Sequence, residues 1–389
     1  MATTDDARRP GGRRPFPHGP RKERSNTVPK DALVSRGELT VSQEVAATLP
    51  DGRPVIRWTI GSPEGVTVEV LSLGARLQAL HAPDRDGRRA NVVLGCDRVE
   101  DLLGEAAYFG ATVGRYANRI ADGVLPLDGT THRLTTQPGG HTLHGGTDGF
   151  ATRLWDGVPV REGRRAGVRL RLHSPDGDQG FPGALTVEVT YLLDPAGELW
   201  IGYRAATDAP TVVNLTNHTY FNLAGEGSGT VLYHLLRVEA PGYLPVDAEL
   251  IPIGPVARAL GTPFDLREAR LIGDRVVDGD PQIRRAGAGF DHNWVLDGNG
   301  FRRAAVLSHP ASGRRVECLT TEPGLQVYTG NHFDGTLIGR SGRPYEAYAG
   351  IALETQHFPN SPNRPEYPST VLRPGEEFRS MTVYCFSAD

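Results

Sequence analysis

The chain has 389 residues, with 42 Lys or Arg against 46 Asp or Glu and a formal net charge of −4. An acidic balance disfavours nucleic-acid binding, which needs a basic face for phosphate contacts. The longest apolar runs are a few residues and too short to span a membrane, and Cys96, Cys318 and Cys385 are too few and too dispersed for a disulfide framework. We therefore expect a cytoplasmic globular protein whose cysteines act as small apolar residues.

The first 37 residues differ from the remainder. They hold nine Arg or Lys and four Asp or Glu, a net charge of +5, and they are rich in Pro, Gly and Ser. Such a segment has little to bury, so we predict a disordered basic tail over residues 1–37. Residues 38–389, with 33 basic and 42 acidic residues and a net charge of −9, are predicted to form a single domain.

From about residue 40 onward, apolar and polar residues alternate in short runs. Period-two alternation is typical of strands with one buried and one exposed face. The clearest runs are Val66, Val68 and Val70; Val168, Leu170 and Leu172; Leu185, Val187, Val189 and Tyr191; and Ile351 and Leu353. Turn pairs such as Asp51-Gly52 and Asp128-Gly129 separate many of the runs, and residues 98–103 are the best helical candidate. The pattern predicts an all-β fold, one large antiparallel β-sandwich whose curved outer face can hold a polar ligand.

Two early segments contain side chains that could bind a ligand. The sequence GRYANRI supplies Arg115, Asn118 and Arg119, which could equally be solvated surface charge. Next, His141 and His144 form an H-x-x-H, with His144 followed by two glycines. A zinc site needs three or four ligands in a fixed geometry and nothing nearby in sequence completes one, so we predict no metal.

The segment NLTNHTYFNLAG surrounds His218 with Asn214, Asn217 and Asn222. Asparagine is poorly suited to strands, so these amides need hydrogen-bond partners, and a bound polyol is one candidate. A histidine that only bonds a backbone carbonyl is the alternative.

Two carboxylates follow in strand-like surroundings. Asp291 lies in GFDHNW, where it could accept hydrogen bonds from sugar hydroxyls or simply occupy a turn. Glu354 alternates with Ile351 and Leu353 and therefore points to the polar side of its strand. On a concave face, partial desolvation would raise its pKa and make it a better base. An exposed charge on an edge strand is the alternative.

Taken together, these segments resemble the aldose 1-epimerase (galactose mutarotase) family. The matching pieces occur in the family's order from about residue 40 to the C-terminus, and they read YFGATVGRYANRI, TLHGG, DGDQGFPG, NLTNHTYFNLAG, GTPFDLR, GFDHNWVL, EPGLQVYTGN and ETQHFPNSPN. The resemblance implies a large β-sandwich, often called a supersandwich, that works without a cofactor. Two departures are the basic tail and His141, which stands where the family commonly has Asn.

The resemblance also implies a role for each matching residue. Glu354 stands at the general base and His218 at the general acid, while His144 matches a second histidine beside the reacting centre. The sugar hydroxyls would be held by Asn118, Arg119, Asp291 and Gln326.

The expected reaction is interconversion of the α and β anomers of free aldoses such as galactose or glucose, through ring opening. Ionised Glu354 would take the O1 proton and protonated His218 would donate to O5, a state favoured between the ordinary pKa values of about 4.3 and about 6.5. The expected partner is the sugar alone, bound by a monomer or homodimer.

Three other functions remain open. A hexose-6-phosphate 1-epimerase would need a basic cluster at the site. A carbohydrate-binding protein without activity would need only the binding residues. A glycosidase would use Asp291 and Glu354 as a carboxylate pair.

Overall fold

A computed structural model describes residues 39–62, 64–276 and 279–389. The predicted basic tail, residues 1–37, lies outside the described residues, and the single domain over 38–389 stays a prediction. Within the described segments, no helix is both long and apolar enough to cross a membrane.

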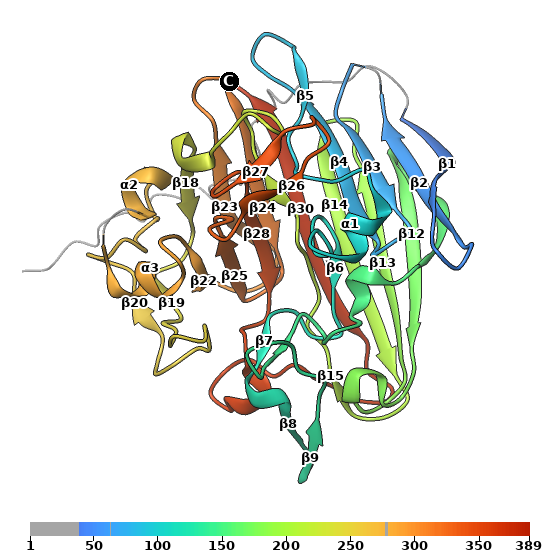
Figure 1. The fold of residues 1–389 in the computed structure, drawn as a ribbon, viewed down its shortest axis with the longest axis vertical. Helices are drawn as coiled ribbons and strands as arrows, with labels where there is room; N and C mark the ends of the chain where they lie inside the picture. The colour runs from blue at the N-terminus through green and yellow to red at the C-terminus, as the bar shows by residue number, and fades with distance from the viewer. Residues whose placement is uncertain (1–38, 63, 277–278) are drawn as a thin grey trace, which may run out of the picture. The chain divides into compact units, whose positions relative to one another are not determined.

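A nine-stranded antiparallel sheet forms one layer of the fold (Figure 1). In spatial order its strands are β11 (Asp156–Glu162), β12 (Arg165–Ser174), β13 (Leu185–Leu193), β14 (Glu198–Thr207), β30 (Phe378–Ala388), β24 (Arg314–Thr320), β23 (Arg302–Ser308), β18 (Leu235–Val238) and β21 (Arg270–Leu271). The predicted alternation is confirmed here, because Val187 and Val189 are buried while Glu188 between them is partly exposed. Each strand therefore buries one face in the core.

Two further antiparallel sheets face this layer. The five-stranded sheet runs β1 (Thr40–Thr48), β2 (Pro54–Gly61), β3 (Thr67–Leu71), β4 (Arg76–Pro83) and β5 (Arg89–Asn91). The six-stranded sheet runs β17 (Tyr220–Phe221), β28 (Ile351–Gln356), β25 (Gly324–Tyr328), β22 (Asp291–Val295), β19 (Gly242–Tyr243) and β20 (Ala257–Arg258). An antiparallel bridge between Val93 and Phe221 joins the two. The predicted all-β sandwich is confirmed.

The remaining elements are short. The helices are α1 (Val99–Leu103), α2 (Ile272–Val276) and α3 (Pro281–Arg285), so the predicted helix at residues 98–103 is confirmed. Two-stranded pairs are β6 (Thr112–Val113) with β16 (Thr216–Asn217), β7 (Arg119–Ile120) with β10 (Thr142–Leu143), β8 (Val124–Leu127) with β9 (Thr130–Arg133), β15 (Thr211–Val212) with β29 (Val371–Leu372), and β26 (Asp334–Ile338) with β27 (Pro344–Glu346). Single 3-10 turns occupy Ala121–Gly123, Phe150–Thr152, Asp178–Gly180, Val231–Tyr233 and Ser361–Asn363.

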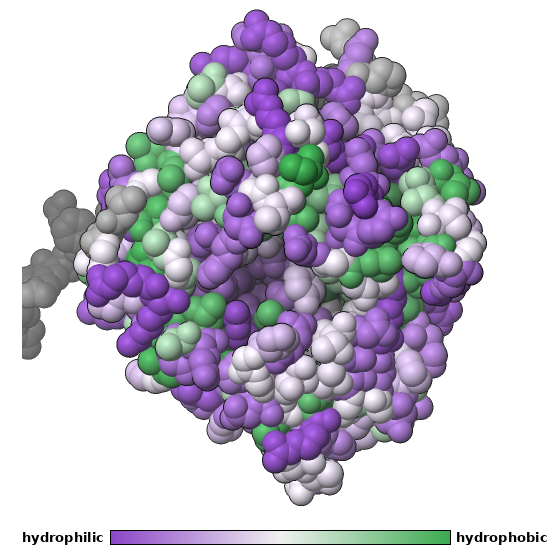
Figure 2. Space-filling model, in the orientation of Figure 1, coloured by the Kyte–Doolittle hydropathy of each residue, from purple (hydrophilic) through white to green (hydrophobic). Residues whose placement is uncertain are grey.

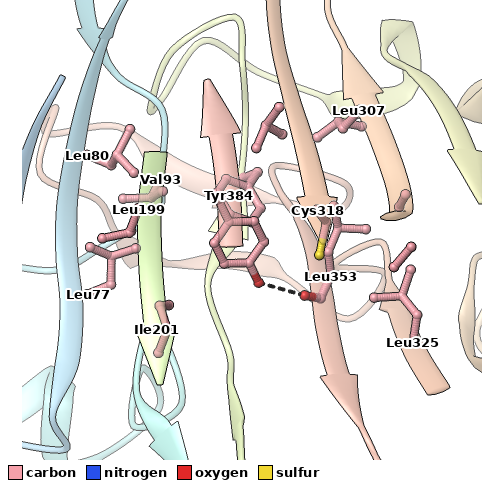
Figure 3. Close-up of a cluster of buried hydrophobic side chains, with 14 of the residues drawn as sticks. Leu77, Leu80, Val93, Leu199, Ile201, Leu307, Cys318, Leu325, Leu353 and Tyr384 are labelled. Carbon is pink, nitrogen blue, oxygen red and sulfur yellow. Dashed lines mark hydrogen bonds between the residues drawn. The ribbon is translucent and has the colours of Figure 1, made fainter. Parts of the chain in front are cut away.

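The main core lies between the layers, and Figure 3 shows its central part. Burial of each large aliphatic side chain stabilises the fold by roughly 1.5–3 kcal/mol. The one polar contact drawn there crosses the layers, where the Tyr384 hydroxyl on β30 donates to the Leu353 carbonyl on β28 at 2.9 Å. This contact ties the strand that carries Glu354 to the nine-stranded sheet.

A buried guanidinium holds the loop after α1. Arg76, on β4, donates to the carbonyl oxygens of Ala106 (3.0 Å), Phe109 (2.6 Å) and Ala107 (2.9 Å). Burial lowers its pKa to about 10. Because these carbonyls flank Tyr108, Arg76 fixes the segment that presents the Tyr108 ring.

We predict that Arg76→Met lowers the free energy of unfolding by on the order of 3 kcal/mol, because it leaves several buried carbonyls without a donor. Urea denaturation followed by tryptophan fluorescence measures the change. The matched control, Arg88→Met, alters a guanidinium that is 78% exposed and should change stability by about 0.5 kcal/mol or less. Equal losses in both variants would contradict the role given to Arg76.

Candidate active site

Strand register brings the predicted acid and base together. On β28, Leu353 faces the core, so Glu354 faces the opposite side, where Gln326 on β25 is its direct neighbour. On the other side of β28 lies strand β17, in which Tyr220 pairs with Ala352. Because the strands are antiparallel, extending this register by two residues before Tyr220 places His218 opposite Glu354. The His218 Nε2 and Glu354 Oε1 atoms are 3.5 Å apart, and both side chains are at most 5% exposed.

The face that carries these residues is hollowed. Figure 2 shows a recess near the middle of the view, lined by hydrophilic side chains, over β25 and β28 of Figure 1. Side-chain nitrogen or oxygen atoms of His144, His218 and Glu354 all lie within 4.8 Å of one another, and all three residues are buried.

The surroundings of His144 settle its tautomer. The backbone N–H of Asn118 donates to the ring nitrogen Nδ1 of His144 at 3.1 Å. The backbone N–H of His144 donates in turn to the Asn118 carbonyl at 3.1 Å. Because Nδ1 accepts, the ring proton of the neutral imidazole is on Nε2. His144 therefore presents a hydrogen-bond donor to the recess and has no lone pair there for a metal, so the cluster with His218 and Glu354 does not fit a metal ion.

Aromatic rings enclose the two histidines. The centroid of the Tyr108 ring lies 4.6 Å from that of His144 and 6.0 Å from that of His218, and the Tyr108 and His218 rings are nearly parallel. The ring centroids of Tyr220 and His218 are 4.9 Å apart. The Gln137 amide donates to the Tyr108 hydroxyl at 2.9 Å. Sequence reasoning missed Tyr108, although it opens the motif YFGATVGRYANRI. The contacts with His144 and His218 depend on the fold, so the motif alone could not give the role.

Desolvation dominates the electrostatics of the site. Burial raises the pKa of Glu354 well above its usual value, with a further rise from the Asp291 charge and an opposing effect from Arg119. Burial lowers the pKa of His218 to about 4. The two values are thus reversed from their ordinary order, and the single proton of the pair rests on Glu354 when the site holds no ligand.

This reversal corrects the pH window that we expected from the sequence. Ordinary pKa values confine the singly protonated pair to roughly pH 4.3–6.5. Burial disfavours both charged side chains, so the pair keeps one proton from about pH 4, the pKa of His218, up to the raised pKa of Glu354.

The other predicted binding residues surround this pair. Gln326 donates through Nε2 to Asp291 Oδ1 at 2.6 Å, which fixes both side chains. Gln326 Oε1 and Glu354 Oε2 have no hydrogen-bond partner within the described part of the chain, and both are buried. Asn118 uses Oδ1 to accept from the Arg119 N–H at 2.8 Å. The arrangement leaves two acceptors free for ligand hydroxyls, and it gives Asn118 a role in shaping the loop.

Several candidates from the sequence are structural instead. Arg115 is not a surface charge, because it is buried and donates to the Gly183 carbonyl (2.7 Å) and the Ser174 hydroxyl (2.6 Å). The suggestion that the asparagines beside His218 meet a polyol is wrong. Their side chains donate to backbone carbonyls, from Asn214 to Ala117 (3.1 Å), from Asn217 to Gly110 (2.7 Å) and from Asn222 to Ala349 (2.9 Å).

His141 is also engaged outside the pair. Its Nδ1 accepts from the Asp122 N–H at 2.9 Å, and its Nε2 lies 3.1 Å from Glu249 Oε2. Both ring nitrogens are therefore occupied. His141 links two loops, and a direct bond to a ligand hydroxyl would require one of these contacts to break.

The chain is similar to proteins of known activity. A family model described as aldose 1-epimerase matches residues 57–385. Galactose mutarotase from Bos taurus is 43% identical over 350 residues, covering 90% of this chain and 99% of that protein. Aldose 1-epimerase from Escherichia coli (strain K12) is 41% identical over 350 residues, covering 89% and 99%. The crystal structure of galactose 1-epimerase from Lactobacillus acidophilus NCFM has a TM-score of 0.79 at 32% identity, covering 90% and 99%.

We predict that Asp291→Asn lowers the pKa of Glu354, because it removes the like charge that opposes ionisation of this carboxyl. Carbon-13 NMR of labelled glutamate carboxyls measures the pKa, with the Glu354 signal assigned by its loss in Glu354→Gln. Asp156→Asn, an exposed aspartate on β11, is the matched control and should leave the Glu354 titration unchanged. A rise in the Glu354 pKa in Asp291→Asn would contradict the prediction.

Proposed function

Because the chain belongs to the aldose 1-epimerase family and is therefore an enzyme that interconverts sugar anomers, we propose that it acts on free aldoses such as galactose or glucose and that Glu354 and His218 move the protons. The single observation that supports this assignment is the 3.5 Å approach of Nε2 and Oε1 in a desolvated recess. A base and an acid so close together can serve two oxygens of one pyranose.

The reaction moves two protons and breaks one bond. Glu354 removes the proton of the anomeric hydroxyl O1 while His218 delivers a proton to the ring oxygen O5, and the C1–O5 bond breaks to give the open-chain aldehyde. Rotation about the C1–C2 bond exposes the other carbonyl face. Closure, with the two proton transfers reversed, gives the other anomer. No electron leaves the sugar, so the cycle balances.

The resting proton must first move from Glu354 to His218. The two arrangements have the same net charge, and the short gap between Nε2 and Oε1 allows direct transfer. A bound sugar favours the ionised carboxylate, because its hydroxyls can donate to the unpartnered Glu354 Oε2. Binding thereby prepares the base and the acid together.

The remaining groups hold the sugar in place. His144 donates from Nε2 to an oxygen beside the reacting centre, and Arg119, Asp291, Gln326 and Asn118 hold or position the ring hydroxyls. Such positioning removes translational and rotational freedom before the chemical step. Tyr108 packs beside both histidines and limits the access of water.

Charge at the site favours free sugars over phosphorylated ones. Among the described residues, Arg119 is the cation whose charge acts on Glu354 and His144. One arginine is a weak match for a phosphate, which is commonly held by several cations. We place the enzyme in the cytoplasm, acting as a monomer or homodimer, in keeping with its free Cys96, Cys318 and Cys385.

We predict that Glu354→Gln and His218→Asn each lower kcat by roughly 10²–10⁴-fold while the fold persists, because each removes one proton-transfer group. The double variant should lose little more than the worse single variant, because the two groups act as a unit. Polarimetry on fresh α-galactose measures turnover, and circular dichroism measures the fold. Glu366→Gln and His173→Asn, both exposed, are the controls. A near-normal rate in either active-site variant would remove that residue from the mechanism.

The pH profile is a separate prediction. The singly protonated pair is lost below about pH 4, where His218 also becomes protonated, and again above the raised pKa of Glu354. Activity, as kcat/KM, should therefore have its acidic limb near pH 4 and its alkaline limb well above the usual range of a glutamate. A profile that peaks near pH 5 and falls by pH 7 would show that ordinary pKa values apply.

A further inference from the structure

The outer face of the nine-stranded sheet contains a hollow that the proposed reaction does not use. Ile201 and Tyr203 of β14 lie in the core, so the residues between and beside them point outward. The hollow has a volume of about 240 Å³, and among its lining residues are Thr190, Leu192, Trp200, Gly202, Met381 and three arginines. The core separates it from Glu354, which is on the outer face of the opposite layer.

The absence of a side chain at Gly202 helps to form this hollow, and the backbone conformation there does not require a glycine. It is inside β14, where glycine destabilises a strand relative to alanine. Its φ is not among the positive values of the described residues, and a Cβ there would meet only the Met381 side chain, at 3.6 and 3.8 Å. These are ordinary contacts, so neither turn geometry nor crowding explains the glycine. A larger side chain would occupy the hollow.

Two exposed arginines on neighbouring strands line the hollow. Arg204 on β14 is directly opposite Arg379 on β30, and like charges in that position repel. Arg379 pairs with Glu377, whereas no ion pair joins Arg204 to any described residue, including Glu188, its cross-strand neighbour on β13. The repulsion is therefore only partly neutralised within the protein.

A third arginine and an aromatic ring form one wall. The Arg165 guanidinium stacks on the Trp200 ring at 3.6 Å and lies 4.0 Å from an Asp194 carboxylate oxygen. Glu162 is the single acidic residue in the lining, against three arginines. Over residues 38–389 the net charge is −9, so this cluster of three arginines is opposite in sign to the net charge of the domain.

We propose that the hollow binds a small organic anion, with its phosphate or carboxylate group between Arg204 and Arg379. Each guanidinium can donate two parallel hydrogen bonds to such a group, and the bound charge removes their mutual repulsion. The Thr190 hydroxyl on the floor is a further donor, and Leu192 with Trp200 provides an apolar wall for the rest of the ligand.

Phenyl phosphate, benzoate and phenol are the probes, and isothermal titration calorimetry measures their binding to the whole chain. Phenyl phosphate, benzoate or both should bind, and phenol should not. Which anion binds more tightly distinguishes phosphate from carboxylate. The double variant Arg204→Gln/Arg379→Gln should weaken anion binding by roughly tenfold or more, because it removes charge-assisted hydrogen bonds. Arg258→Gln, an exposed arginine on β20, is the matched control and should bind as the parent does.

Gly202→Val provides a second variant that leaves every charge in place. It should abolish anion binding by filling the hollow and leave mutarotation unchanged. Without any anion, Arg204→Gln alone should raise the melting temperature, because it relieves repulsion. The proposal is overturned if neither anion binds, if phenol binds as tightly as phenyl phosphate, or if Gly202→Val and the double arginine variant bind like the parent. Displacement of the anion by galactose would also overturn it, because the anion would then be in the recess beside Glu354.

Discussion

The contact between the Glu354 carboxyl and the His218 imidazole organises this protein. Two strands far apart in sequence must pair in one register for these groups to meet, since a shift of one residue would turn Glu354 into the core. The register is held by the apolar neighbours of Glu354 and by the Tyr384 hydroxyl, which bonds the Leu353 carbonyl from the opposite layer. The architecture of the sandwich thus determines the geometry of the Glu354 and His218 pair.

Burial then decides the charge state of that pair. Removing both groups from water disfavours each charged form, which raises the pKa of Glu354 and lowers that of His218. A neutral pair with one proton is the result, and in the proposed reaction a polar sugar would supply the hydrogen bonds that water would otherwise provide. Beside it, the Asn118 backbone keeps His144 as a neutral donor. The recess therefore contains His144 as a fixed hydrogen-bond donor beside the Glu354 and His218 pair, whose charged forms are disfavoured by burial.

Buried arginines hold the loops around the recess. Arg76 and Arg115 are both nearly inaccessible to solvent, and both donate to backbone carbonyls of neighbouring loops. A guanidinium has five N–H donors, so it can satisfy several irregular carbonyls at once, which a loop without secondary structure needs. Motifs that the chain shares with its family, such as YFGATVGRYANRI, consequently contain residues that support the fold as well as residues of the site.

Strand alternation in the sequence was enough to determine the all-β class and the outward direction of Glu354, because period two depends only on neighbouring residues. Motif order determined the family and the set of residues that gather in the recess. The tertiary structure alone decided the rest. Asn214 meets the His357 backbone 143 residues away, Tyr108 reaches both histidines across the fold, and the pKa reversal needs water to be excluded. Partners distant in the chain and desolvation leave no local pattern in the sequence.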